Sequence, residues 1–308
     1  MTLQYVVKIK FRAPFHVGPY GGDLNTTSHI VHSWTLYGAI GHAASMLFEA
    51  SKVREFIKNL KLSSLFPLVE EAGKEIYFVP RPLQMPDNLS PSLMKKLKRL
   101  NYVPIHLLKT WKSIREEDIT EIHEHLSGIK EINVPSVAID RSTSASNIYY
   151  VSALVHSESL KFYFIAVLSD NKEYENMLKA SLRLAAEEGI GGRRHTRGWG
   201  IFELSENILT PLEKTPLMEY FEEEKPPWIV ISPYVPDDKE IEHISENCYY
   251  SIETFRSFVY PTDILKPDIH FFREGSVFNF KPKGKHIVYE DEYGVTPGNV
   301  LSLSTLWG

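Results

Sequence analysis

Residues 133–204 constrain the fold more than any other part of this sequence. They begin with three apolar, β-prone runs at residues 134–139, 148–155 and 161–168, joined by polar turns. Residues 174–188 then carry apolar side chains at helical spacing, and Gly189 is placed to end that helix. Residues 199–204 are again apolar and β-prone. The predicted order is therefore three strands, a helix, a glycine-rich loop and a strand.

The start of the chain supplies a strand and a helix that complete this pattern. Apolar and charged side chains alternate in residues 3–15, which is the period of two of a half-buried strand. Residues 35–50 carry apolar positions three and four apart, which predicts a helix capped by Ser33 or Thr35. The combined order is the βαββαβ order of a ferredoxin-like, RRM-like domain, so we expect the α+β class.

The domain organisation is predicted from breaks in these periods. Residues 210–227 are rich in proline and glutamate and predict a linker. We therefore expect tandem domains: an N-terminal ferredoxin-like domain over residues 1–213, and a ferredoxin-like or β-rich domain over residues 214–308. Residues 52–130 are less regular and predict an insertion in the first domain. Within this insertion, residues 93–100 carry four cations, which indicates a solvated helix face or a phosphate contact.

The net charge of -5 conceals a difference between the two parts. Residues 1–213 hold 25 Lys and Arg against 23 Asp and Glu, or +2. Residues 214–308 hold 9 against 16, or -7. The N-terminal part can hold an anion locally, whereas the C-terminal part is a poor match for a phosphate backbone.

Composition also excludes several classes of protein. The lone Cys248 supports neither a disulfide framework nor a zinc ribbon. The sequence shows no secretory leader and no run of roughly 20 apolar residues that would span a membrane. We expect a cytoplasmic protein without cofactor, metal or membrane contact.

The glycine-rich loop predicted after the long helix is the segment that carries chemistry. Residues 189–202 hold five glycines and three arginines. Glycine lets the backbone approach a ligand closely, and arginine donates forked hydrogen bonds to phosphate. His195 and Trp199 add flat faces on which an unpaired base can stack. The loop therefore predicts a contact with single-stranded RNA.

Two other interpretations apply to a loop of this composition. Nucleotide-binding glycine loops follow a strand and precede a helix, whereas this loop has the reverse order. That order argues against an NTPase or a dehydrogenase. Alternatively, the arginines pair with Glu187 and Glu188 and the loop is only a structural turn.

The loop resembles the glycine-rich loop of the RAMP superfamily of CRISPR-associated RNA-binding proteins. Four further segments resemble one group of that superfamily, the fourth Csm subunits of type III-A interference complexes. They are Phe15-His16-Val17-Gly18, residues 32–39 (HSWTLYGA), residues 139–143 (IDRST) and residues 272–278 (FREGSVF). Trp34 departs from the group, which commonly has an acidic residue there, so no role is assigned to it.

The resemblance implies a non-catalytic subunit of the Csm complex in antiviral defence. It would grip the 5′ repeat-derived handle of the guide RNA (crRNA) and join the large polymerase-like subunit to the backbone subunits. The loop between the first two strands of residues 133–204 would insert as a thumb between guide and target RNA. The RNA-binding residues expected on this basis are Gly191, Gly192, Arg193, Arg194, His195, Arg197, Gly198, Trp199, Arg141, His32 and Ser33.

Two other functions stay open. A metal-independent endoribonuclease needs a general base, and the candidates are His16, His29, His32, His42 and His195. A protein-interaction module whose loop never touches RNA is the third possibility. The sequence offers no motif for serine or cysteine hydrolysis and no set of metal ligands at a defined spacing.

Overall fold

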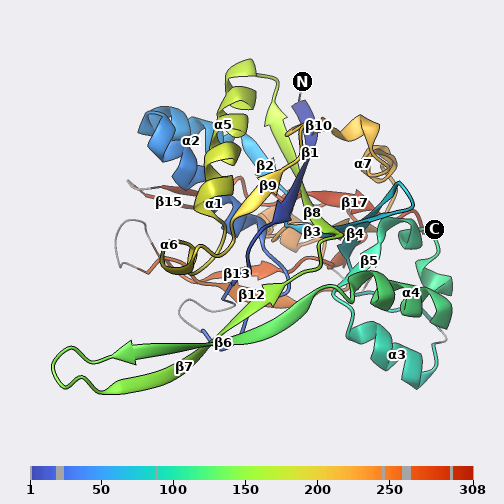
Figure 1. Ribbon diagram of the computed structural model, residues 1–308. Coiled ribbons are helices and arrows are strands. Elements are labelled where there is room, and N and C mark those ends of the chain that lie inside the picture. Colours follow the sequence, from blue (N-terminus) through green and yellow to red (C-terminus); the bar gives the residue numbers. More distant parts are fainter. Residues whose placement is uncertain are drawn as a thin grey trace.

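The computed structural model describes residues 2–18, 24–87, 89–244, 247–258, 265–291 and 294–307, without the side chains of residues 194 and 195. An antiparallel sheet and its helices form the body, and one long hairpin extends from it (Figure 1). The predicted α+β class is confirmed. Within the described part of the chain, no helix combines the length and the apolar character that crossing a membrane requires.

The central strand of the main sheet is β8 (Leu160–Ser169). It is buried over almost its whole length, in keeping with its run of apolar side chains. On one side it pairs antiparallel with β1 (Thr2–Phe11), and on the other with β2 (Leu60–Leu62) and β3 (Phe66–Glu71). β1 in turn pairs with β9 (Phe202–Leu204) and β10 (Thr210–Pro211).

Two helices connect these strands. Helix α1 (Ser33–Leu47) follows β1, and helix α5 (Lys172–Glu188) follows β8. They lie side by side against the sheet (Figure 1). The strand order β9/β10, β1, β8, β2/β3, with α1 in the first crossover and α5 in the second, is the βαββαβ arrangement of the N-terminal part.

The expected insertion has different bounds in the structure. Helix α2 (Ala50–Lys58) leads directly into β2 and β3, so residues 60–71 are core strands of the sheet rather than inserted sequence. Sequence periodicity missed this because β2 and β3 are short and their connection is itself buried. The segment between β3 and β8 extends the sheet with two strands and carries two helices and the hairpin. Its elements are β4 (Lys74–Pro80), α3 (Pro91–Lys98), β5 (Tyr102–Pro104), the 3₁₀ turns η1 (Ile105–Leu108) and η2 (Trp111–Ser113), α4 (Glu116–Leu126), β6 (Lys130–Ile139) and β7 (Ser146–Val155).

The C-terminal part consists of short strands with little helix. Strands β11, β14 and β17 form a three-stranded sheet, whereas β12 pairs with β13 and β15 with β16. The described residues of this part are thus β-rich, which is one of the two forms expected for it. A second ferredoxin-like unit and a domain boundary at residue 213 stay predictions. The elements beyond β10 are η3 (Leu212–Lys214), α7 (Met218–Glu222), β11 (Trp228–Val230), α8 (Asp238–Ile241), β12 (Ile252–Phe255), β13 (Ile269–Phe272), β14 (Val277–Phe278), β15 (Ile287–Glu290), β16 (Val295–Pro297) and β17 (Ser302–Ser304).

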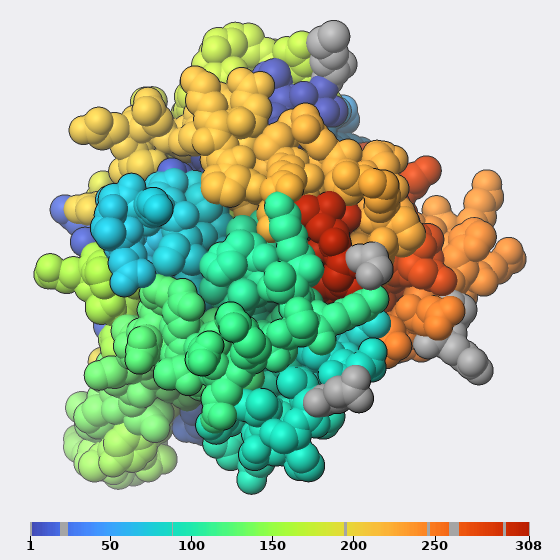
Figure 2. Space-filling model, turned by 90° about the vertical axis from the view of Figure 1, so that its right-hand side faces the viewer, coloured from blue at the N-terminus to red at the C-terminus, as the bar shows by residue number. Residues whose placement is uncertain are grey.

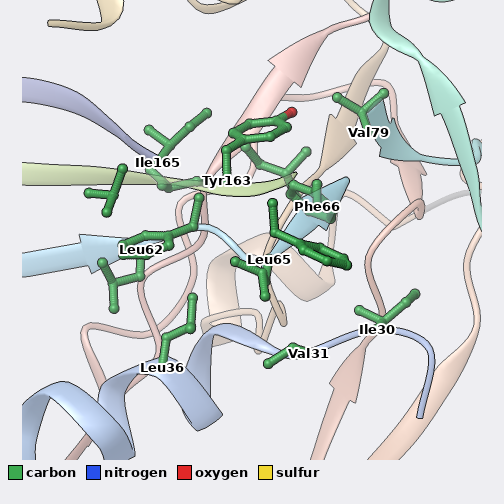
Figure 3. Close-up of a cluster of buried hydrophobic side chains, with 14 of the residues drawn as sticks. Ile30, Val31, Leu36, Leu62, Leu65, Phe66, Val79, Tyr163 and Ile165 are labelled. Atoms are coloured by element: carbon green, nitrogen blue, oxygen red, sulfur yellow. The ribbon is translucent and has the colours of Figure 1, made fainter. Parts of the chain in front are cut away.

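The hydrophobic core runs through both parts of the chain. One cluster of buried side chains joins residues of the main sheet and α1 to Ile229 and Leu303 of the C-terminal sheet. Figure 3 shows its centre, where Leu36, Phe66 and Tyr163 converge from α1, β3 and β8.

The segment expected to be a linker is packed against this core. Leu212, Leu217 and Tyr220 are each 3% exposed or less. Proline and charge interrupt its periodicity without freeing it, because three large apolar side chains in a short stretch are enough to bury it.

Candidate nucleic-acid interface

The glycine-rich loop runs from the end of α5 to β9 and encloses the one-turn helix α6 (Arg194–Arg197). It packs on the segment that follows β1. The amide of Gly192 donates to the carbonyl of His16 over 2.8 Å, and the amide of Gly200 donates to the carbonyl of Pro14 over 2.8 Å. Two of the segments that carry the resemblance, residues 15–18 and the loop, are therefore one structural unit.

Glycine is required here by close backbone approach. Gly191 has φ +88° and Gly200 has φ +74°, a region that side-chain-bearing residues rarely adopt. A Cβ atom on Gly191 would clash with the carbonyl oxygen of His16, and one on Gly200 would clash with that of Ile190. Gly198 also has positive φ but has more space around it.

Trp199 is a core residue of this unit rather than an exposed stacking platform. It is 6% exposed and packs with Val151 and Ala153 of β7. The expectation that a base stacks on Trp199 is wrong for this conformation, because the inner face of the β6–β7 hairpin covers the ring. Sequence alone did not place that hairpin against the loop.

Arg193 and Arg197 tie the loop to the same hairpin. Arg193 Nη2 donates to the Tyr149 hydroxyl over 3.3 Å, and its guanidinium lies 5.6 Å from the centre of that ring. Arg197 Nη2 donates to Ser136 Oγ over 2.7 Å, and its guanidinium lies 5.8 Å from the Trp199 ring centre. Both side chains thus have contacts within the chain, while Arg197 is exposed and Arg193 is partly exposed.

Two predicted residues of the loop lie outside the described side chains. These are Arg194 and His195, of which only the backbone is placed, in α6. Arg141 is exposed at the tip of the hairpin, in a turn where Asp140 Oδ1 accepts from the amides of Ser142 and Thr143. These two hydrogen bonds hold the pKa of Asp140 below its usual value.

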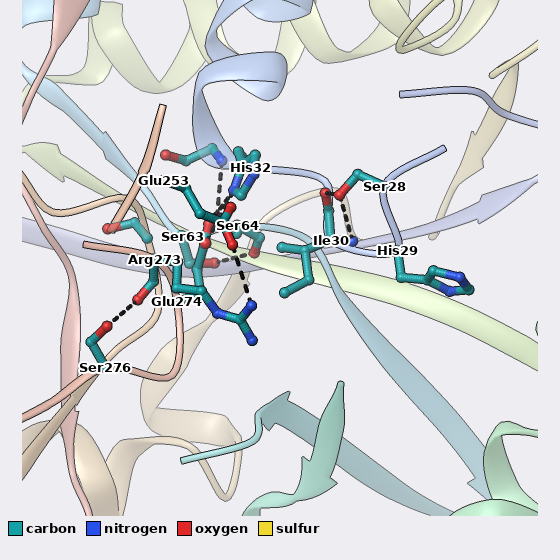
Figure 4. A network of polar contacts seen from close by, with 12 residues as sticks. Ser28, His29, Ile30, His32, Ser63, Ser64, Glu253, Arg273, Glu274 and Ser276 are labelled. Carbon is teal, nitrogen blue, oxygen red and sulfur yellow. Dashed lines mark hydrogen bonds and ion pairs between the residues drawn. The ribbon is translucent and has the colours of Figure 1, made fainter. Parts of the chain in front are cut away.

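His32 and Ser33 belong to a different, buried cluster. His32 Nδ1 lies 2.8 Å from Glu274 Oε1, Ser64 Oγ donates to the same carboxylate, and the Ser33 amide donates to Ser64 Oγ (Figure 4). Glu274 is 1% exposed and Ser33 is 3% exposed. The expectation that His32 and Ser33 contact RNA is therefore wrong. Their cluster instead joins the start of α1 to the C-terminal part of the chain. His32 precedes α1 and makes no side-chain cap to it, and the cap expected from Ser33 or Thr35 is absent.

The ionisation of this pair follows from its surroundings. Burial alone would lower the pKa of His32, but the Glu274 carboxylate outweighs it and raises this pKa. Burial alone would raise the pKa of Glu274, but His32 and the hydrogen bonds from His32 and Ser64 lower it. Each of the two groups thus favours the charged form of the other.

A cleft with a volume of about 730 Å³ opens beside the glycine loop. Gly191 and Gly192 form part of its wall, and helices α1 and α2, Asp291 and residues 255–258 and 294–297 form most of the rest. Lys266 also lines it, and burial lowers the pKa of this side chain. A cleft with a glycine backbone wall and a cation is suited to a nucleotide, since backbone and charge both face the ligand.

The outer face of the hairpin is a candidate surface that sequence reasoning missed. Its side chains Val137, Ile139, Ile148 and Tyr150 are exposed by 54%, 67%, 64% and 53%. Val137 pairs with Ile148 across the strands, so these residues share one face, opposite to the face that covers Trp199. The alternation was visible in the sequence, but which face the body would cover was not.

Three of the five candidate general bases have contacts with other parts of the chain, and the side chain of His195 lies outside the described residues. His16 is 5% exposed, and its Nδ1 lies 2.8 Å from the Ser152 carbonyl. His32 is engaged with Glu274, and His29 Nε2 lies 3.6 Å from a Glu131 carboxylate oxygen. No group of three or more His, Cys, Asp or Glu with metal-binding geometry occurs within the described residues.

Trp34 joins α1 to the C-terminal part of the chain. Its indole nitrogen donates to the Pro297 carbonyl over 2.8 Å, and its ring packs against Phe255 and Phe271. The residue that departs from the family pattern thus has a structural role here.

Comparison with known proteins agrees with this geometry. Residues 223–302 match the family model described as CRISPR Csm4 C-terminal domain. A Methanocaldococcus jannaschii protein described as CRISPR system Cms protein Csm4 is 26% identical, with 88% of this chain and 84% of that protein covered. A Thermococcus onnurineus protein of the same description is 27% identical, with 55% of this chain and 61% of that protein covered.

Solved structures share the fold over nearly the whole chain. A chain in the Csm3-Csm4 subcomplex of the type III-A CRISPR-Cas interference complex aligns with a TM-score of 0.67 at 22% identity, covering 98% of this chain and 99% of that chain. A chain in the Csm1-Csm4 cassette with cA4 aligns with a TM-score of 0.58 at 17% identity, covering 98% and 97%.

The βαββαβ sheet, the glycine loop after its second helix and the protruding hairpin are the features in which the chain resembles proteins of the RAMP class. Within that class the chain is Csm4-like, since its sequence is similar to Csm4 proteins and its fold to chains of Csm4 complexes. The resemblance predicted from the sequence is confirmed.

Proposed function

We propose that this chain is a guide-RNA-binding structural subunit of a type III CRISPR effector complex and acts in the cytoplasm. It holds the 5′ repeat-derived handle of the guide along the glycine loop and the adjoining cleft. It joins a large polymerase-like subunit to the backbone subunits and catalyses no reaction itself.

The observation that carries this proposal is the glycine wall of the cleft. Gly191 and Gly192 are held on the His16 carbonyl and also line the 730 Å³ cleft, so no side chain separates the loop backbone from a ligand. Arg193 and Arg197 lie in the same loop, between the cleft and the hairpin. Exposed backbone and cations are elements with which proteins hold single-stranded RNA.

The hairpin supports the part of the proposal that concerns the target RNA. It extends well beyond the body (Figure 1), and its outer face exposes Ile148 and Tyr150. An apolar and aromatic face of this kind fits between nucleobases, as the resemblance to thumb-bearing subunits implies.

The proposed partners follow from the relatives. One structure of the same fold is a Csm3-Csm4 subcomplex and others are Csm1-Csm4 cassettes. We infer equivalent neighbours for this chain: a backbone subunit on one side and the large subunit on the other.

Binding to guide RNA tests the proposal directly. The purified chain is titrated in a filter-binding assay with RNA that carries the repeat-derived handle and with the same RNA with a scrambled handle. We expect tighter binding to the first RNA, with assembly of a complex when the large and backbone subunits are added. Equal binding to both RNAs together with failure to assemble contradicts the proposal.

Cleavage is tested with the same RNA. After incubation without metal, a denaturing gel is expected to show the RNA intact. Specific cleavage at the repeat that disappears in a His29→Ala or His42→Ala variant would instead identify an endoribonuclease.

A further inference from the structure

A second cavity, with a volume of about 920 Å³, shares no lining residue with the cleft beside the glycine loop. Its border comes from two regions that are far apart in sequence. One contributes Arg81, Leu83, Met85 and Lys98, and the other contributes Ile244 and residues 248–251 of the C-terminal part. Figure 2 shows the face that carries α3 at its bottom, with the orange C-terminal strands at its right.

Among the described residues, Arg81 is a buried cation without an acidic partner in this cavity. The residue is 8% exposed, and the hydrogen bonds it makes to described residues go to the carbonyls of Leu100 and Pro82 and to Met85 Sδ. Its Nη2 has no acceptor within the described residues. Burial, and then the neighbouring Arg273, lower the pKa of Arg81 to about 10, so the guanidinium is still charged at neutral pH.

Such an arrangement is costly unless an anion completes it. Burial of a charge without a counter-ion opposes folding, and neutral acceptors compensate it only in part. The carbonyl contacts account for Nε and Nη1, and the described residues place no acceptor on Nη2 of this cavity-lining side chain. A carboxylate supplied by a binding partner would complete this site.

The rest of the border is apolar and aromatic. Leu83 and Met85 line the cavity from one side, and Tyr249 and Tyr250 line it from the other with 40% and 44% of their surface exposed. Residues 241–252 also expose Ile241 and Ile252 by 53% and 59%. Tyrosine and arginine beside aliphatic side chains are the composition of protein interfaces.

We propose that this cavity is a docking site for a protein segment that places a carboxylate on Arg81 and packs an apolar side chain on Tyr249 and Tyr250. The inference rests on the proposed function, because the segment belongs to a neighbouring protein subunit of the effector complex. Lys98 at the border attracts the same acidic segment.

A protein fits this cavity better than RNA does. RNA requires cations spaced along a path, whereas this cavity offers one buried guanidinium and one lysine between aliphatic walls. The C-terminal part that forms half of the border carries a net charge of -7, from 9 basic and 16 acidic residues, and repels a phosphate backbone.

A photo-cross-linker at the border identifies the occupant. Tyr249 is replaced by p-benzoylphenylalanine, and the chain is assembled with guide RNA and the other subunits before irradiation. A cross-link to a protein subunit, at a segment that contains Asp or Glu, supports the inference. A cross-link to RNA, or none in a complete complex, overturns the inference and leaves the proposed function intact. If neither the labelled chain nor the wild-type chain forms a complex, the inference and the proposed function both fail.

Charge reversal at the border gives an independent measurement. Lys98→Glu is expected to weaken binding of the cross-linked subunit at least fivefold, with an unchanged thermal midpoint, because Lys98 is exposed and has no ion pair within the described residues. Lys95→Glu makes the same change on the same helix outside the cavity and should alter binding less than twofold. Equal effects of the two variants would show a general charge effect and overturn the assignment of the cavity.

Discussion

His32 and Glu274 form the most consequential single contact between the two parts of the chain. Their side chains come from sequence positions 242 residues apart and meet in a site where Glu274 is 1% exposed. Two segments that carry the family resemblance thus meet in one ion pair. A buried pair of this kind is sensitive to the loss of either partner, because the other charge remains buried.

We expect this pair to make stability depend on pH with a defined sign. The pKa of His32 is raised above 6.5, so its contribution is complete below pH 6.5 and is lost as the pH rises through the raised value. The pKa of Glu274 is lowered below 4.5, so its contribution is complete above pH 4.5 and is lost as the pH falls through the lowered value. Stabilisation is therefore greatest between pH 4.5 and 6.5.

Urea unfolding of the wild-type chain and of Glu274→Gln checks this expectation. The difference in unfolding free energy should be largest in that window and shrink on both sides of it. Glu173→Gln, which removes an exposed partner of Lys52, serves as the control and should differ little from wild type at any pH. A difference for Glu274→Gln that is independent of pH would contradict the charged pair.

Gly191 tests the need for backbone approach in the loop. Gly191→Ala puts a Cβ at φ +88° and against the His16 carbonyl, so we expect a loss of unfolding free energy of at least about 1 to 2 kcal/mol and weaker RNA binding. Gly38→Ala is the matched control: its Cβ meets nothing within 4 Å, and alanine favours the helix by about 0.5 to 1 kcal/mol. Thermal and urea unfolding of the two variants measure these changes in stability. A neutral Gly191→Ala would show that the loop has an alternative conformation.

Arg193 and Arg197 have a mixed role. Because each contacts the hairpin, the double change to alanine should lower the unfolding free energy by about 1 to 2 kcal/mol, the sum of two partly exposed cation and hydrogen-bond contacts. RNA affinity should fall at least tenfold. Arg183→Ala, on an exposed face of α5, should leave both properties unchanged. Wild-type RNA affinity in the folded double variant would show that the arginines only hold the hairpin.

At the scale of elements, the β6–β7 hairpin is the part with two distinct faces. The inner face packs on Trp199 through Val151 and Ala153, and the outer face is exposed. The Ile148→Ser, Tyr150→Ser double variant should therefore leave the thermal midpoint unchanged, since exposed positions rarely contribute more than about 0.5 kcal/mol. RNA affinity should fall about tenfold, because stacking on an aromatic side chain is worth about 1 to 3 kcal/mol per base.

Ile241→Ser is the control for the hairpin variant. It removes a side chain that is 53% exposed, similar to Tyr150, at a site outside the proposed RNA path. RNA binding of this variant should equal that of wild type in the filter assay. Equal losses in both variants would show that any exchange of an exposed apolar side chain for serine weakens RNA binding, and that the hairpin has no special role.

At the scale of the whole molecule, charge limits how strongly the isolated chain binds RNA. The net charge is -5, and the basic groups are confined to local patches. For single-stranded RNA, each neutralised phosphate contributes about -0.7 to the slope of log affinity against log salt concentration. About three to five phosphate contacts should therefore give a slope of about -2 to -3.5. Filter binding across a salt series measures it. A slope near zero would contradict the expected phosphate contacts. A much steeper slope would require an extensive basic surface, which the net charge of -5 argues against.

Elements with strong periodicity were predictable from the sequence alone. Strands β1, β7 and β8 and helices α1 and α5 appear within a few residues of their expected bounds, because each buries a face whose spacing matches its own period. The glycine loop was also predictable, since five glycines in a short window disfavour a helix or strand and favour a loop.

Tertiary structure decided how these elements use their side chains. It buried Trp199 under the hairpin, engaged Arg193 and Arg197 with the hairpin, and placed His32 on Glu274. None of these contacts has a local signal, because each joins residues 44 to 242 positions apart. Periodicity reports which face of an element is buried, whereas the identity of the covering element depends on packing that only the folded chain defines.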